Sequence, residues 1–567
     1  MAKKLFSALL AALALLASCA AAEEVERGMV LGEIMRELDL PLKTGKSFGD
    51  VDETTPYHSE VESALSLGIL YPSDDFSPEI ACANAEALMF ALQAMGFRHE
   101  AETAAWALPN PDKKLPSYIS GYVSLARALV PAAPESVSKD PWGSTTTAQL
   151  REILRWLRKC RASVVWDCAI RRPEGTLRIH RENVGRPPEG WRVQLGVFDV
   201  EENARAFADK LDTEDCPIIV VDREHDYAVA TPRIADRSLA HAIAEKLRKL
   251  GALIRPDSGE SGALFWTSFT PASPADAVIR MNKALDAKTL GKLSDIASAN
   301  GALCAVNGGY FSSSGAIGTL FSGGLPASLP YHNRSMAAWD GKGNMFFGGG
   351  EFISRLSVNG GAPIDIILNG TADMDTPAVL TPAFGLARRA GNNGYVARIR
   401  GGKAVEAAKA LVFKRDMGPD EWFVVSRDPR TAPQLGDSVS LVTRWREKIP
   451  FDVETAVQAG PLIYAPGRTM RGEMLSESIL KRRHPRTLIG SDGKNMVWIV
   501  ADGRSAWHSR GLTLTEAAAL GRKLGLKYLL NLDGGGSSEM WWNGHIVNDV
   551  SDGRERKMPY GLMVLEK

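Results

Sequence analysis

Carboxylates and an arginine follow two apolar runs near the C-terminus. Residues 496–500 precede Asp502 and Arg504, and residues 528–532 precede Asp533. Continuous apolar runs of this length are typical of buried strands, so these polar residues stand at predicted strand ends. Carboxylates suit proton transfer or nucleophilic attack, and arginine suits an anionic group. The pattern indicates an active site for a negatively charged substrate, with Asp533 and Asp502 as its catalytic residues.

The segment between the two runs has the pattern of a helix. Thr513, with Glu516 three residues later, forms a capping box, and residues 517–524 are good helix formers before Gly525. Strand, helix and strand of these lengths predict a right-handed parallel crossover in which both strands end at one edge of the sheet. We therefore expect the polar residues after the two runs to meet in one crevice.

The glycines after Asp533 are a predicted anion site. Glycine accepts positive φ and has no side chain, so successive N–H groups can point at a phosphate, and the serines that follow add hydroxyl donors. A tight structural turn is the alternative. The position of the loop, directly after a buried strand and a carboxylate, favours binding. The residues assigned to phosphate are Gly534, Gly535, Gly536 and Ser537.

Two further segments place polar residues at predicted strand ends. Residues 304–306 lead into Asn307 and Gly308, and His484 and Arg486 precede another apolar run. Arg486 carries a guanidinium suited to bidentate phosphate contact, and Asn307 would orient a sugar hydroxyl or the attacking water. Arg486 or Arg504 taken alone would more often be a surface or ion-pair residue. His484 is as well explained by a structural role.

Six motifs occur in the order of the phosphodiester glycosidase family, to which N-acetylglucosamine-1-phosphodiester α-N-acetylglucosaminidase belongs. They lie at 307–311, 459–462, 484–487, 502–504, 531–538 and 548–556, the last of which contains Arg554, a further phosphate-binding candidate. Residues 264–567 therefore resemble this family. The resemblance implies hydrolysis of a sugar-1-phosphate diester on the glycosidic side. Glycine clusters between short β-rich runs predict a mixed α/β (α+β) catalytic domain with a strand-rich core.

The mechanism follows from the leaving group. A phosphate monoester, with a second pKa of about 6, departs readily, so binding its charge matters more than protonating it. Asp533 and Asp502 are the candidate base and acid or nucleophile, and the division of roles between them stays open. No cofactor is assigned. No His/Cys spacing demands a metal, although a divalent cation stays open because several carboxylates converge.

Residues 190–255 resemble a SPOR domain, the small fold that recognises peptidoglycan glycan strands. Residues 191–198 alternate like a half-buried strand, residues 202–211 are helical, residues 227–230 form a strand, and residues 239–250 form an amphipathic helix. The order β-α-β-β-α-β fits a ferredoxin-like α+β fold. A generic α+β spacer is the alternative.

Residues 45–165 show short helical patterns that resemble a degenerate S-layer-homology region. Residues 48–51 and 76–78 carry the resemblance. The arginine usual in that family is missing beside Asn84 and Glu86, and it would be the side chain that binds an anionic wall polymer. The region is therefore interpreted as a structural spacer.

The N-terminus predicts export. Lys3 and Lys4 precede a short apolar run in residues 1–22, which reads as a signal peptide because it is too short to span a bilayer. Residues 16–19 resemble a lipobox that would place a lipid on Cys19, and ordinary cleavage is the alternative. We expect a periplasmic or outer-membrane-associated protein whose membrane contact is this lipid alone.

Length and charge set the remaining limits. The chain has 567 residues, too many for one hydrophobic core, which predicts a multidomain protein. Its formal net charge of +0 gives no indication of charge-driven nucleic-acid binding. The function predicted is an exported hydrolase of sugar phosphodiesters in envelope or extracellular glycans. The alternatives are a non-catalytic peptidoglycan-binding protein and a phosphodiesterase that breaks the P–O bond.

Overall fold

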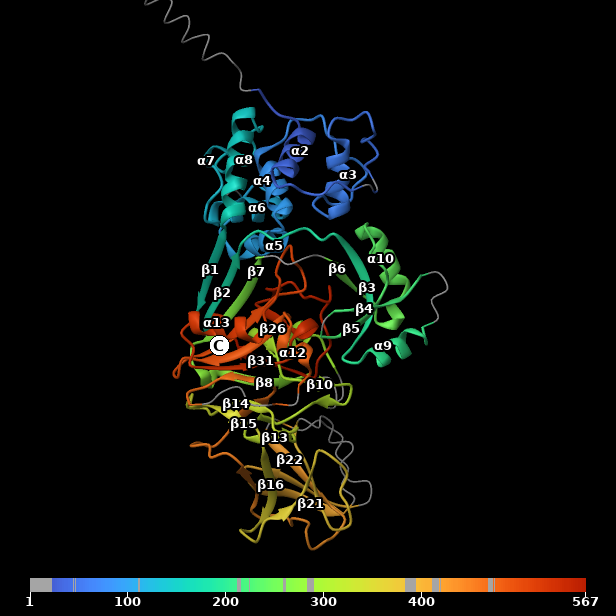
Figure 1. The fold of residues 1–567 in the computed structure, drawn as a ribbon. Helices are drawn as coiled ribbons and strands as arrows, with labels where there is room; N and C mark the ends of the chain where they lie inside the picture. Colours follow the sequence, from blue (N-terminus) through green and yellow to red (C-terminus); the bar gives the residue numbers. More distant parts are fainter. Residues whose placement is uncertain are drawn as a thin grey trace, which may run out of the picture.

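The computed structural model shows a multidomain, strand-rich protein of mixed α/β composition (Figure 1). It describes residues 23–43, 45, 47–110, 113–211, 216–223, 225–257, 262–282, 290–382, 394–409, 418, 420–467, 473 and 475–567. The predicted signal peptide, residues 1–22 with Cys19, lies outside these. Within the described ranges, none of the helices has the length and apolarity needed to cross a membrane.

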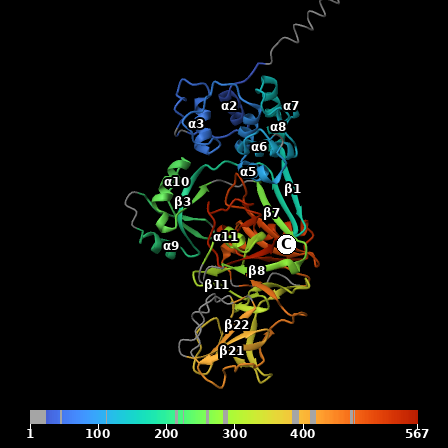
Figure 2. The same ribbon diagram turned by 180° about the vertical axis from the view of Figure 1, so that it is seen from behind.

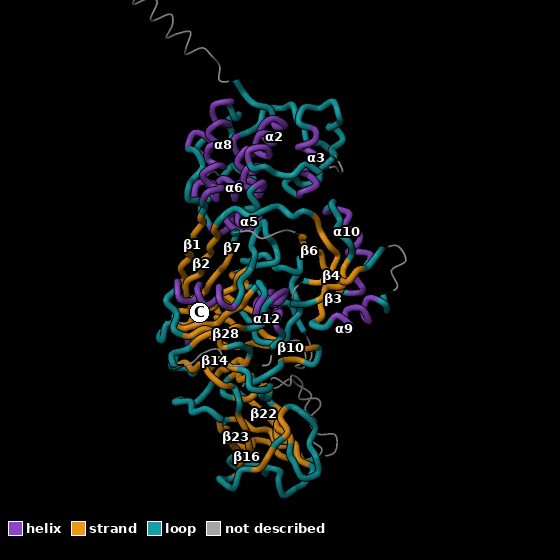
Figure 3. Tube along the Cα trace, viewed as in Figure 1, coloured by secondary structure: helices purple, strands orange, loops and turns teal. Residues whose placement is uncertain are grey.

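The N-terminal region is a helical bundle, which Figure 3 shows at one end of the molecule. Its helices are α2 (Arg27–Glu37), α3 (His58–Leu67), α4 (Asn84–Ala94), α5 (Arg98–Ala107), α6 (Ser117–Ala128), α7 (Glu135–Ser138) and α8 (Thr147–Ala162). Helix α4 is the most apolar of these, and Leu88, Phe90 and Leu92 are fully buried within the bundle. Helix α5 lies at the bottom of the bundle, against the strands that follow.

A seven-stranded sheet carries the segments with predicted catalytic residues. Its order is β1 (Val165–Arg172), β2 (Gly175–Glu182), β7 (Leu264–Pro271), β27 (Met496–Ala501), β26 (Arg486–Ser491), β28 (Tyr528–Asn531) and β25 (Leu462–Tyr464). Strand β26 is antiparallel to both β27 and β28. Strands β27 and β28 therefore run in the same direction and end at one edge, as predicted, but β26 lies between them.

The connection between β27 and β28 contains the predicted helix. Helix α13 (Leu514–Lys523) begins at Thr513, whose hydroxyl accepts from the N–H of Glu516 at 3.2 Å, and the Glu516 carboxylate accepts from the N–H of Thr513 at 2.9 Å. Gly525 follows its end with φ +77°. The capping box and the glycine therefore fix both ends of the helix, as the sequence predicted.

The sheet begins before the predicted boundary at residue 264. Strand β2 pairs with β7 from Glu182↔Leu264 to Gly175↔Pro271. Residues 183–263 thus leave the sheet and return to the neighbouring position. A boundary at 264 would remove β1 and β2 from the sheet that bears the site.

Residues 190–257 form a separate α/β unit inserted at this point. Its elements are β3 (Gly190–Phe198), α9 (Glu201–Ala208), β4 (Ile219–Asp222), β5 (Tyr227–Ala230), α10 (Arg237–Lys246) and β6 (Leu253–Asp257), with sheet order β4-β5-β3-β6. Val193, Leu195 and Val229 belong to the core beneath the two helices. Because side chains alternate along a strand, Arg192 and Gln194 lie on the opposite, helix-free face.

A second sheet packs against the first. Its order is β30 (His545–Ile546), β29 (Met540–Trp542), β9 (Ala302–Asn307), β31 (Tyr560–Leu565) and β8 (Ala277–Met281), and helix α11 (Leu293–Ala299) covers it. Phe269 of the first sheet lies between the two, with ring centroids 5.6 Å from Trp498 and 5.6 Å from Trp542. This contact marks the centre of the core.

The remaining strands build the far end of the molecule (Figures 1 and 2). A five-stranded sheet has the order β13 (Leu325–Ser328), β12 (Leu320–Ser322), β24 (Thr455–Gln458), β14 (Ser335–Trp339) and β15 (Met345–Gly349), and β10 (Phe311–Ser312) pairs with β11 (Gly315–Ala316). A β-lobe is inserted between β15 and β24. It comprises β16 (Phe352–Val358), β17 (Ile364–Asp365), β18 (Ile367–Leu368), β19 (Ala378–Leu380), β20 (Tyr395–Arg400), β21 (Lys403–Lys409), β22 (Glu421–Ser426) and β23 (Val439–Trp445).

We expect Phe269→Ala to destabilise the two-sheet unit by about 3–5 kcal/mol, because it leaves a cavity between fully packed aromatic rings. The matched control is Ile353→Ala in the β-lobe, where the side chain is 62% exposed and the expected change is within about 0.5 kcal/mol. Scanning calorimetry measures both. Equal transition temperatures for the two variants would contradict a core centred on Phe269.

Candidate active site

The predicted site residues come together where strands β9, β26, β27 and β28 begin or end. Asn307, at the end of β9, is fully buried. Its Nδ2 donates to the carbonyl of Asp533 at 2.8 Å, and its Oδ1 accepts from Thr487 Oγ1 at 2.6 Å and from the N–H of Glu539 at 3.1 Å. The Asn307 amide therefore positions the loop that bears Asp533, and its contact with a sugar hydroxyl or water stays a prediction.

The glycine loop forms a tight 3₁₀ turn over Gly535–Ser537. The N–H of Gly534 donates to Asp533 Oδ1 at 3.0 Å, that of Gly535 to the Pro485 carbonyl at 2.9 Å, and that of Ser537 to the Gly534 carbonyl at 3.2 Å. Three of these N–H groups are thus used by acceptors within the protein, as in the structural turn that the sequence offers as the alternative. The assignment of residues 534–537 to phosphate stays a prediction.

The glycines allow charged side chains to approach this turn. A Cβ at Gly535, which has φ +64°, would lie 2.8 Å from Arg504 Nη2, and one at Gly536 would lie 2.0 Å from Asp552 Oδ2. Ser537 is buried, and its Oγ accepts from Arg556 Nη1 at 3.3 Å. The turn therefore leaves space for the charged side chains beside it.

Asp533 is half-buried beside this turn. Burial raises the pKa of its carboxyl, and the Ser537 hydroxyl, Arg556 and Arg504 oppose that rise only in part. A carboxyl with a raised pKa exchanges protons closer to neutral pH than an ordinary aspartate does. Asp533 therefore has the properties expected of a catalytic acid or base.

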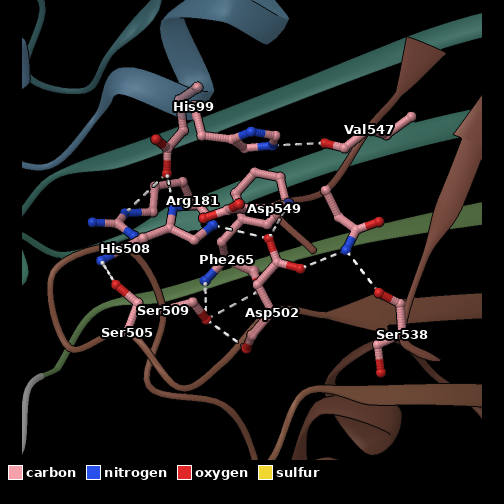
Figure 4. Close-up of polar contacts among 12 residues, drawn as sticks. His99, Arg181, Phe265, Asp502, Ser505, His508, Ser509, Ser538, Val547 and Asp549 are labelled. Atoms are coloured by element: carbon pink, nitrogen blue, oxygen red, sulfur yellow. Dashed lines mark hydrogen bonds and ion pairs between the residues drawn. The ribbon is translucent and has the colours of Figure 1, made fainter. Parts of the chain in front are cut away.

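Asp502 has a different environment (Figure 4). It is buried, and its carboxylate accepts from His508 Nε2 at 2.9 Å, from Asn548 Nδ2 at 2.8 Å and from the N–H of Asp549 at 2.7 Å. These donors occupy both carboxylate oxygens. Asp502 thus fixes the loop that begins at Asn548, and its predicted catalytic role stays a prediction.

A buried chain of charges continues from His508 into the N-terminal helical region. His508 Nδ1 lies 3.1 Å from Glu100 Oε1 on α5, and Arg181 Nε on β2 lies 3.5 Å from the same oxygen. Burial alone would lower the pKa of His508, but Glu100 and Asp502 raise it to about 10. Burial opposes ionisation of Glu100, yet His508 and Arg181 lower its pKa to about 2. His508 and Glu100 are therefore both charged at neutral pH.

Local sequence patterns did not predict this chain of charges. Glu100 lies in the segment interpreted as a spacer, and Arg181 lies between two predicted domains. His508 follows the Asp-Gly-Arg motif by only a few residues, but histidine without a metal-ligand or nucleophile pattern carries little information. Glu100 and His508 are far apart in the sequence, and only the fold places them in contact.

Arginines gather around Arg504 on the open side of the turn. Asp552 lies 2.6 Å from Arg255, 2.7 Å from Arg556 and 3.6 Å from Arg504. A second carboxylate, Asp226, lies 2.6 Å from both Arg223 and Arg482. The cluster thus places five arginines around two carboxylates, and its arginines are Arg223, Arg255, Arg482, Arg504 and Arg556.

The excess of positive charge affects the pKa of Arg504. Burial, together with the nearby Arg255, Arg556 and Arg223, lowers its pKa to about 9 despite the attraction of Asp552. Arg255 and Arg223 come from the inserted α/β unit, so that unit supplies part of the cluster. The sequence analysis did not single out these two residues.

The other predicted phosphate-binding residues lie around this cluster with different exposure. Arg486 is buried and donates to the carbonyls of Leu512, Ile479 and Arg482, so most of its guanidinium fixes the segment that includes α12 (Glu477–Lys481). Burial lowers its pKa to about 10. Arg554 is exposed and lines a cavity next to Arg504.

His484 and Gly308 both make contacts that stabilise the fold. His484 Nε2 lies 2.9 Å from the carbonyl of Ser478, and burial together with Arg486 and Arg504 lowers its pKa to about 3, so it is neutral. A Cβ at Gly308 would lie 2.1 Å from the Tyr560 ring. Gly308 is therefore required for packing at the end of β9.

Glu539, directly after the turn, is a further buried group that the sequence analysis did not single out. Burial and the neighbouring Glu555 raise the pKa of its carboxyl to about 9, so it is neutral at pH 7. Within the described ranges, no three His, Cys, Asp or Glu side chains are arranged to hold a metal ion.

Comparison with known families finds two matches. The phosphodiester glycosidase family matches residues 392–565, and the SPOR domain family matches residues 187–256. The resemblances drawn from the motifs and from the 190–255 pattern are thereby confirmed. Together they support a hydrolase with an envelope-binding module.

Individual relatives are more distant. The prophage-derived protein YomE of Bacillus subtilis (strain 168) is 41% identical over 86 residues, which are 15% of this chain and 13% of that protein. This chain therefore spans only a small part of that relative.

Similar solved structures share limited geometry with this chain. A protein of Burkholderia pseudomallei K96243 described as exported has a TM-score of 0.48 at 18% identity, over 71% of this chain and 96% of that one. A Synechocystis protein has a TM-score of 0.40 at 18% identity, over 71% and 77%. The catalytic domain of zebrafish N-acetylglucosamine-1-phosphodiester α-N-acetylglucosaminidase has a TM-score of 0.29 at 14% identity, over 54% and 78%.

We expect Glu100→Gln to destabilise the protein by about 3–5 kcal/mol, because it leaves buried Arg181 and His508 without their shared partner. The matched control is Glu102→Gln, an exposed side chain on the same helix, with little expected effect. Thermal unfolding at pH 6 measures both changes.

The pH dependence gives a second readout. The pKa of His508 is raised to about 10, so its stabilisation is complete below its unfolded pKa of about 6.5 and is lost as pH rises towards 10. The pKa of Glu100 is lowered to about 2, so its stabilisation is complete above about 4.3 and is lost as pH falls towards 2. In Glu100→Gln the loss of stability between pH 6.5 and 10 should be smaller, because Glu100 no longer raises the pKa of His508. An unchanged pH profile would contradict the ion pair.

Proposed function

We propose that this chain, which carries a phosphodiester glycosidase segment and a SPOR domain, is an exported hydrolase of sugar-1-phosphate diesters in envelope or extracellular glycans. The observation that supports it most directly is the position of Asp533, a carboxyl with a raised pKa, beside Arg504 and Arg556. Such a pair of features matches a substrate whose leaving group is an anion.

The proposed reaction cleaves the glycosidic C–O bond. Water attacks the anomeric carbon, and its oxygen becomes the new sugar hydroxyl. The phosphate monoester leaves with the bonding electrons, and a proton of the water passes to Asp533. Hydrolysis then ends when Asp533 returns this proton to solvent or to the phosphate.

The arginines would bind the departing phosphate. Arg504 and Arg556 lie beside the turn and, with Arg255, surround a single carboxylate, so the cluster has positive charge left for a ligand. Arg554 would add an exposed contact. Arg486 and Asn307 would not contact the phosphate directly and would act by fixing the neighbouring backbone segments.

Asp502 is proposed as a positioning residue. Its bonds to Asn548 and to the N–H of Asp549 fix the loop that carries Asp552 and Arg556. The helical region contributes Glu100 to the same network, which supports the structural role predicted for it. Binding of peptidoglycan glycan strands by the SPOR domain, export through residues 1–22 and a lipid on Cys19 complete the proposal.

We expect Asp533→Asn to lower turnover about 10²- to 10⁴-fold, as the loss of a general acid or base does. The assay follows release of free sugar from UDP-N-acetylglucosamine and simple sugar-1-phosphate diesters by the full chain. The control is Asp492→Asn, the same isosteric change in the turn after the other end of β26, where the side chain binds Lys494 and Asn495. Normal turnover by Asp533→Asn would overturn the assignment.

Hydrolysis in ¹⁸O-labelled water identifies the bond that breaks. Label in the sugar means C–O cleavage, as proposed. Label in the phosphate would instead indicate the phosphodiesterase alternative, since the same arginines would serve either reaction. Release of no product from any diester would favour the non-catalytic binding protein.

A further inference from the structure

A cavity of about 570 Å³ lies where the helical region, the SPOR domain and the catalytic loops meet. Its size falls within the usual range for ligand pockets. Helices α3 to α5 contribute one wall, helix α10 and strand β6 contribute the second, and residues 503–508 and 549–554 contribute the third. Arg504 is part of the third wall, so the cavity adjoins the proposed active site.

Unneutralised arginines line this cavity. Among the described residues, no carboxylate oxygen lies within ion-pair distance of Arg98, Arg237 or Arg554. Burial and the nearby Arg98 lower the pKa of Arg237, and the attraction of Asp549 offsets this only in part. Two further acidic residues on the wall are already engaged, because Glu245 lies 3.0 Å from Arg248 and Asp552 pairs with the arginine cluster. Glu102, exposed on α5, also lines the wall, so these three arginines face two remaining carboxylates, Glu102 and Asp549. The cavity therefore favours an anion.

Two glycines allow large side chains to reach the cavity. A Cβ at Gly96, which has φ +81°, would lie 2.4 Å from the Trp507 ring. A Cβ at Gly68, which has φ +78°, would lie 2.7 Å from Arg237 Nη1. The flat face of an indole is a common contact for a sugar ring, because it offers apolar surface beside polar groups.

The cavity also has an unmatched hydrogen-bond acceptor. Gln93 lines the cavity and is only 3% exposed. Its Nε2 donates to Tyr122 Oη at 2.8 Å, whereas its Oε1 is buried with no hydrogen-bond partner in the described protein. A buried acceptor without a partner is unfavourable, so a hydroxyl donor from a ligand would stabilise it.

We propose that this cavity binds an anionic saccharide unit, with Arg237 and Arg98 at its charged group, Trp507 at its ring and Gln93 at a hydroxyl. The saccharide would be a neighbouring unit of the glycan whose diester is cleaved, since Arg504 borders both places. This last point rests on the proposed function. The binding itself does not depend on it.

The test measures binding of N-acetylglucosamine-6-phosphate and its neutral match, N-acetylglucosamine, to the full chain by calorimetry and tryptophan fluorescence. We expect the phosphorylated sugar to bind more tightly, and Arg237→Gln to weaken its binding about tenfold or more. Lys246→Gln removes one positive charge from the same helix outside the cavity and should bind normally. Gln93→Leu should weaken binding of both sugars.

The outcomes separate this proposal from the proposed function. Equal binding by wild type, Arg237→Gln and Lys246→Gln would overturn the cavity proposal, as would equal affinity for the two sugars. Weaker binding by Arg237→Gln, in a protein that hydrolyses none of the diesters, would support the cavity and overturn the proposed function. Hydrolysis of UDP-N-acetylglucosamine by a protein whose sugar binding does not depend on Arg237 would support the proposed function and overturn the cavity proposal.

Discussion

The site depends on one constraint, that charges removed from water must be paired. Arg181, Glu100, His508 and Asp502 alternate in sign through the interior, and three of them are completely or almost completely hidden from solvent. Each of these groups would be strongly unfavourable alone. The chain of charges therefore joins the helical region, strand β2 and the loop after β27 into one arrangement. Through Asp502 it also fixes the loop that carries the arginine-binding carboxylate Asp552.

Positive charge around that carboxylate comes from separate parts of the chain. Arg504 and Arg556 belong to the catalytic loops, whereas Arg255 belongs to the SPOR domain. An envelope-binding module of this kind is thus more than an attachment, because it contributes side chains next to the proposed active site. Burial and these nearby like charges together lower the pKa of Arg504.

Local patterns in the sequence predicted the elements well, because capping boxes and apolar runs act over a few residues. They indicated α13 and the shared edge of β27 and β28. The antiparallel strand β26 between them was not foreseen, since its pairing depends on partners distant in sequence. Side-chain roles were harder to predict. Three N–H groups of the glycine turn have acceptors within the protein, and Asn307 and Asp502 are engaged there too, because hydrogen-bond partners are determined by tertiary packing.

The SPOR domain is joined to the catalytic sheet through both of its ends. Glu182 and Leu264, which bracket the insertion, are paired neighbours on β2 and β7. A module on a single linker sweeps a large volume, but one tethered at two adjacent points has little freedom to rotate or to extend. A glycan strand bound to this module would consequently stay at a nearly constant distance from Asp533. If the chain acts as proposed, cleavage would be restricted to diesters at a set distance from the part of the strand that the SPOR domain binds.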